Sequence, residues 1–262
     1  MLSSSLLLHL AWLCFAAFIG GGINAIAGGG SLLSFPALLQ VGVLPIHANA
    51  TNTVAMLPGQ ITSAAAYRRD LRRYHTMLPT LLAAAFVGGV LGARLLLATR
   101  QQTFLRMVPW LLLTATLLFA IGPILQQRVF QSTHSTHSSG LRPIARFLLP
   151  VGIFAISVYV GFFGAGAGLL IMATLSFAGI DSVHEINALK TIITSTSNTI
   201  AAATFIFYGA VLWRYGAAMM IAGSVGGYLT ARAARKHKPR GIRALVVTLG
   251  CIVTIYFFYK LH

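Results

Sequence analysis

The chain has 262 residues, of which 57% are hydrophobic and only 8% are charged, and its mean hydropathy is +0.82. A soluble domain carries about a quarter charged residues, so this composition excludes a soluble globule and predicts a protein embedded in a membrane. The net charge of +16 comes from 19 Lys and Arg against 3 acidic residues, and because most basic residues lie at the ends of apolar segments, they favour lipid headgroup contact over nucleic-acid binding.

Ten apolar segments follow one another along the chain. They are 5–24, 28–42, 48–66, 76–97, 104–123, 145–162, 165–179, 187–208, 212–231 and 241–259. Crossing a hydrocarbon core of about 30 Å takes about 20 helical residues. Segments 28–42 and 165–179 are too short for this, and a glycine cluster lies at the start of each. Short glycine-led segments at matching places are typical of a transporter binding site and predict broken or re-entrant helices; plain small-residue packing is the alternative.

The two halves of the chain repeat each other. Residues 84–94 and 222–232 share the pattern Val-Gly-Gly-x-Leu-x-Ala-Arg at a separation of 138 residues. The sequence therefore predicts an all-α polytopic membrane protein built from two homologous repeats of four to five membrane segments each. We expect the first repeat at 1–125, a polar linker at 126–143 and the second repeat at 144–262.

Two loops rich in basic residues bear on orientation. Loop 67–75 carries four arginines, and loop 232–243 carries six Lys and Arg residues. These loops do not occupy matching places in the two repeats. If both are cytoplasmic, each half crosses the membrane an odd number of times, the halves are inverted, and both termini face outward. A fold with eight full spans is the alternative.

Polar residues follow the short segment in each half. On a helix, Asn49, Asn52 and Thr53 lie on one face because they are three and four positions apart, and Gln60 follows about two turns later. The second half repeats this pattern 138 residues on, with Asn187, Lys190, Thr191 and Asn198. Inverted repeats would bring both faces together near the midplane, beside the glycine-led helix ends that contain Gly29, Gly30, Gly166 and Gly168.

The predicted pocket offers many neutral donors and one cation, Lys190. The only acids are Asp70, Asp181 and Glu185, whereas transport of metal cations usually needs buried carboxylates or rings of carbonyls. The residue types favour a small anion, held by hydroxyls, amides, helix N-termini and the lysine as a point charge. Two alternatives stay open. The polar groups bond helix to helix only, or Lys190 extends to the membrane interface.

His47, His184 and Glu185 precede the polar helices and are candidates for proton coupling, because histidine titrates near neutral pH. Helix capping or an interfacial position explains them equally well. The chain has no phosphate-binding glycine loop and no catalytic set of residues, so we expect no enzyme activity, cofactor or metal site. His134 and His137 in the linker read as solvated residues.

The motifs in the two halves resemble the sulfite exporter TauE/SafE family. They are Gly20-Gly21-Gly22-Ile23-Asn24-Ala25-Ile26-Ala27-Gly28-Gly29-Gly30-Ser31, Pro36, Asn49-Ala50-Thr51-Asn52-Thr53, Gly161-Phe162-Phe163-Gly164-Ala165-Gly166-Ala167-Gly168 and Asn187-Ala188-Leu189-Lys190-Thr191. Ser31 stands where the second half has Gly168, so the half-sites need not be equivalent.

The resemblance implies a multi-pass permease of a bacterial-type plasma (inner) membrane that moves small sulfur-containing anions, such as sulfite or sulfoacetate. A channel-like anion pathway and a non-transporting scaffold or assembly factor are the alternatives. The sequence leaves open which anion is carried, the direction of transport, the coupling ion and whether the protein forms a homo-oligomer.

Overall fold

The computed structural model describes residues 4–27, 29–66, 74–133, 143–180, 182–234 and 240–261. Within these ranges every regular element is a helix, which confirms the predicted all-α class. The helices are α1 (Ser4–Ala27), α2 (Ser31–Gln40), α3 (Pro45–Ala66), α4 (Leu78–Ala98), α5 (Gln101–Thr133), α6 (Pro143–Phe162), α7 (Ala167–Phe177), α8 (Val183–Phe207), α9 (Trp213–Ala234) and α10 (Arg240–Leu261).

Each predicted apolar segment corresponds to one of these helices, and the largest difference is at α5. This helix runs on to Thr133, so the first part of the predicted linker is helical. The reason is that residues 124–133 contain neither glycine nor proline, so no helix-breaking residue ends α5 there. Residues 134–142, with His134 and His137, lie outside the described residues.

Three of the described helices are long and apolar enough, by length and composition, to cross a membrane. The spans are Ser5–Ala25 in α1, Leu78–Ala98 in α4 and Gln101–Gly122 in α5. The short helices α2 and α7 have 10 and 11 residues, which at a rise of about 1.5 Å per residue is roughly half of a bilayer core. Large apolar side chains such as Phe86, Val151, Ile221 and Ile255 are exposed, as expected where lipid replaces water as the solvent.

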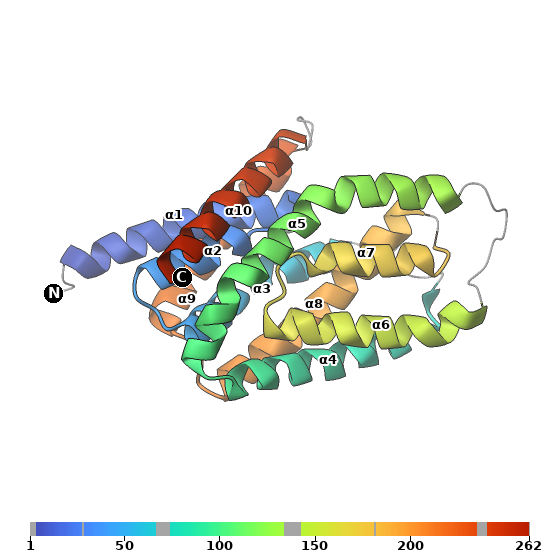
Figure 1. Ribbon diagram of the computed structural model, residues 1–262, viewed down its shortest axis with the longest axis horizontal. Coiled ribbons are helices and arrows are strands. Elements are labelled where there is room, and N and C mark those ends of the chain that lie inside the picture. The colour runs from blue at the N-terminus through green and yellow to red at the C-terminus, as the bar shows by residue number, and fades with distance from the viewer. Residues whose placement is uncertain are drawn as a thin grey trace.

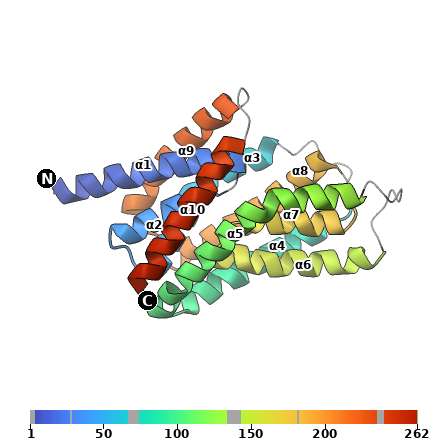
Figure 2. The same cartoon turned by 45° about the horizontal axis from the view of Figure 1, so that its top comes forward.

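The helices gather in two groups that mix both halves of the chain. Figures 1 and 2 show α1, α2, α9 and α10 at one end of the molecule and α4, α6, α7 and α8 at the other. Helix α1 packs along α9, and α4 packs along α6. Helices α3 and α5 contact members of both groups, so they connect the two ends.

Glycines allow the backbones to touch where α1 crosses α9 and where α4 crosses α6. A Cβ atom placed on Gly226 of α9 would lie 2.0 Å from the carbonyl oxygen of Phe18 in α1. One placed on Gly92 of α4 would lie 2.0 Å from the carbonyl oxygen of Val158 in α6. Close backbone approach through small residues is how helices associate in lipid, where no hydrophobic effect drives them together. The two crossings therefore share one packing device.

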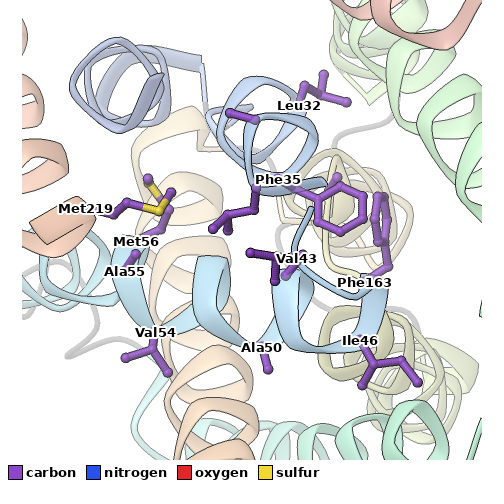
Figure 3. Close-up of a cluster of buried hydrophobic side chains, with 14 of the residues drawn as sticks. Leu32, Phe35, Val43, Ile46, Ala50, Val54, Ala55, Met56, Phe163 and Met219 are labelled. Carbon is purple, nitrogen blue, oxygen red and sulfur yellow. The ribbon is translucent and has the colours of Figure 1, made fainter. Parts of the chain in front are cut away.

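An aromatic cluster fixes the short helix α2 against the break between α6 and α7. The rings of Phe35 and Phe163 meet edge to face, with centroids 5.5 Å apart at 85°, and Phe104 of α5 lies 6.4 Å from Phe35. In Figure 3 the side chain of Phe35 points at Phe163, above Val43 and Ile46 at the start of α3. Such pairs add about 0.5–1.5 kcal/mol beyond the area they bury. The cluster thus holds the broken segments of both halves in one body.

Candidate functional site

Both halves contain a break between a long helix and a short one. At the α6–α7 break, Gly164 and Gly166 have φ angles of +77° and +79°, a conformation that favours glycine. The hydroxyl of Tyr159 donates to the carbonyl of Ala165 at 2.7 Å and secures this turn.

The two breaks lie against the same stretch of α5. A Cβ atom on Gly29 would lie 2.8 Å from the ring of Phe119, and one on Gly166 would lie 3.5 Å from Cβ of Leu118. The structure therefore brings the predicted glycine-led helix ends of the two halves together around one turn of α5.

On α3, the two predicted asparagines are buried and bonded to protein. Asn49 is 2% exposed and donates from Nδ2 to the carbonyl of Phe162, the last residue of α6, at 3.1 Å. Asn52 is also 2% exposed, and its Oδ1 lies 2.5 Å from the hydroxyl oxygen of Ser34 in α2. Their carboxamides position the elements on either side of the break. Whether they also bind substrate stays a prediction.

Ser34 is a residue that the sequence reasoning missed. Its hydroxyl lies 2.5 Å from Asn52 Oδ1 and 3.1 Å from the carbonyl oxygen of Gly30, and its single hydrogen serves one acceptor at a time. The available signal was a lone polar residue in the middle of a short apolar helix. Because polar groups in hydrocarbon are costly, such a residue predicts a buried partner.

Replacing Ser34 with alanine is expected to destabilise the protein by about 1–3 kcal/mol, because the carboxamide of Asn52 then stays buried without its partner. Thermal unfolding of the purified protein in detergent measures the effect. Ser224→Ala is the matched control, since the hydroxyl of Ser224 bonds only the carbonyl of Met220 in its own helix, at 2.7 Å. Equal unfolding temperatures for both variants would show that the Ser34–Asn52 pair contributes little.

On α8, the structure brings the predicted cation next to two other predicted residues. Lys190 is half-buried, and its Nζ donates to Oδ1 of Asn187 at 3.3 Å. Its stem passes the backbone of α7, where a Cβ atom on Gly168 would lie 3.4 Å from Lys190 Cδ. Thr53 and Thr191 donate to carbonyls of their own helices, to Asn49 at 2.9 Å and to Asn187 at 2.7 Å. These hydroxyls are thereby engaged in local bonds.

Gln60 and Asn198 occupy matching positions on α3 and α8. Asn198 is 8% exposed, and the Oε1 atom of Gln60 is buried without a hydrogen-bond partner among the described residues. More than nine-tenths of buried polar groups have a partner, so this acceptor is unusual.

The three candidates for proton coupling lie at the ends of α3 and α8. His47 Nδ1 is 2.9 Å from the carbonyl oxygen of Ala210, just after α8. Glu185 accepts a hydrogen bond from the hydroxyl of Tyr74 at 2.7 Å, and its backbone N–H is capped by Ser182 at 3.4 Å. His184 is exposed. The contacts fit the capping alternative for Glu185, and proton coupling stays a prediction.

These end contacts also fix the relative direction of α3 and α8. His47, at the start of α3, meets the segment that follows α8, whereas Glu185, at the start of α8, meets Tyr74 in the segment that follows α3. The two helices are therefore antiparallel neighbours, and each end of the pair carries one of these contacts, called here the His47 tether and the Glu185 tether.

Comparison with known proteins adds a family to this geometry. A family model described as sulfite exporter TauE/SafE matches residues 13–257. The chain is 32% identical to a probable membrane transporter protein, ORF9, of Sinorhizobium sp over 94% of its length and 91% of the relative. It is 29% identical to a probable membrane transporter protein of Haemophilus influenzae over 95% of its length and 94% of the relative. The figures for YfcA of Escherichia coli K12, another probable membrane transporter protein, are 28%, 97% and 91%. No solved structure matches the chain.

Proposed function

The chain belongs to the sulfite exporter TauE/SafE family and is a membrane transporter, and from this premise we propose that it is a secondary carrier for a small sulfur-containing anion. Sulfite and organosulfonates are the substrates in view. The carrier binds its substrate between the two broken helices and the α3–α8 pair, where the predicted polar residues of both halves lie.

The observation that carries the anion proposal is the environment of Lys190. This ammonium is half-buried in a helix of a membrane protein, and its hydrogen-bond partner is the neutral carboxamide of Asn187. Taking a charge out of water costs several kcal/mol unless an opposite charge compensates it. An anionic substrate supplies that compensation, and the amides and hydroxyls around it supply neutral donors.

Matched contacts support the proposal that the repeats are inverted. Helices α1 and α6 correspond in the two repeats, as do α4 and α9, and α1 packs on α9 just as α6 packs on α4. The tethers match in the same way, because His47 and Glu185 are 138 residues apart. In this proposal the two helix groups rock against each other, and the tethers at opposite ends of α3 and α8 open in turn.

Counterflow in proteoliposomes tests the carrier proposal. Vesicles loaded with unlabelled sulfite are expected to take up labelled external sulfite and to concentrate it transiently, with initial rates that saturate. A carrier behaves this way because each substrate molecule must wait for a site that faces its side. Flux that neither saturates nor shows counterflow would select the channel-like alternative. Absence of any anion flux would select the non-transporting scaffold.

A further inference from the structure

One side chain sets the charge of the candidate site. Every other Lys or Arg side chain whose burial is described is exposed, namely Arg94, Arg100, Arg106, Arg214, Arg232 and Lys260. Lys190 is half-buried. On the same helix, the carboxylate of Glu185 is engaged by the hydroxyl of Tyr74 at 2.7 Å, beyond the end of α3.

The matching position in the first half adds no charge. Asn52 corresponds to Lys190, and its neutral carboxamide is 2% exposed beside the hydroxyl of Ser34. Asn49 likewise presents an amide, bonded to the backbone of α6 at 3.1 Å. The site is therefore asymmetric, with one cation from α8 and neutral groups from α3.

This asymmetry limits the charge of a bound anion. One negative charge beside the ammonium of Lys190 makes a neutral pair. A second negative charge leaves the site with a net charge of −1 in surroundings of low dielectric constant, where an uncompensated ion costs several kcal/mol. The neutral donors stabilise oxyanion oxygens, but they cannot cancel a whole charge.

We propose that the site of the carrier described above selects anions with a single negative charge, and that the loaded site reorients as an electrically neutral pair. This inference rests on the proposed function. Its ligands are monosulfonates and hydrogen sulfite, the form of sulfite that keeps one proton. Doubly charged anions, including sulfate and sulfoacetate, are poor substrates.

A matched pair of sulfonates tests the charge rule in the intact protein. 2-Hydroxyethanesulfonate and sulfoacetate have the same two-carbon chain and the same sulfonate, and they differ in a hydroxyl against a carboxylate. In proteoliposomes we expect the first to enter at least ten times faster at equal concentration. Equal or faster uptake of sulfoacetate overturns the charge rule while leaving the carrier proposal intact. Absence of flux for both sulfonates and for sulfite overturns the carrier proposal, and the charge rule falls with it.

The net charge of the loaded site is measurable without any variant. In exchange mode, with substrate on both sides, only the loaded carrier reorients. We therefore expect the exchange rate of 2-hydroxyethanesulfonate to stay constant when a potassium gradient with valinomycin imposes a membrane potential of either sign. An exchange rate that changes with the potential would show that the loaded site carries net charge and would overturn the neutral pair.

Discussion

Replacing Lys190 with glutamine is expected to lower saturable anion flux by about 10- to 100-fold, while the protein still inserts and folds. A hydrogen bond to a charged group contributes about 1.5–3 kcal/mol, and each 1.4 kcal/mol is a factor of ten in binding or rate. Glutamine keeps much of the stem that packs past Gly168 and keeps a polar end for Asn187. The substitution thus removes the positive charge with little change in packing.

The control for Lys190→Gln is Lys260→Gln. Lys260 is exposed near the end of α10, where its Nζ lies 3.4 Å from the hydroxyl oxygen of Tyr256. Initial uptake rates over a range of sulfite concentrations, normalised to the amount of reconstituted protein, measure both variants. Unchanged flux in Lys190→Gln would remove this residue from the mechanism. Equal losses in both variants would indicate a general effect of lowering the positive charge.

Much of the fold follows from the one-dimensional pattern of apolar residues. The predicted segments 76–97 and 145–162 end within a few residues of α4 and α6, because charged or turn-forming residues bound each apolar run. The exchange of partners between halves did not follow from that pattern. It depends on which helix surfaces carry glycine opposite glycine, as at Gly21 and Gly223, and a sequence records such pairs without stating who meets whom.

The candidate site shows the same division. The helical spacing of Asn187 and Lys190 was enough to place them together, because residues three apart share a helix face. The partners of Asn49 and Asn52 were not predictable in that way. The carbonyl of Phe162 and the hydroxyl of Ser34 belong to elements 113 and 18 residues away in the chain, and only the docking of α2 and α6 on α3 decides that these amides bond to protein.

The glycine crossings give the second large expected effect. Adding one methyl group at Gly226 or at Gly92 is expected to cost about 3 kcal/mol, because each new Cβ would lie 2.0 Å from a carbonyl oxygen of the partner backbone. Backbone cannot rotate away as a side chain does, so α1 must separate from α9, or α4 from α6, and overpacking of this kind typically costs 1–3 kcal/mol or more. Thermal unfolding of Gly226→Ala and Gly92→Ala in detergent checks this.

The matched control is Gly59→Ala in α3, where a Cβ atom would have nothing within 4 Å. Alanine favours helix over glycine by about 1 kcal/mol, so this variant is expected to be as stable as the parent or slightly more stable. Similar losses in Gly226→Ala and Gly92→Ala, with none in Gly59→Ala, would support two equivalent crossings that stay closed while the helix groups move. A loss at only one crossing would contradict that equivalence and would place the moving interface at the other.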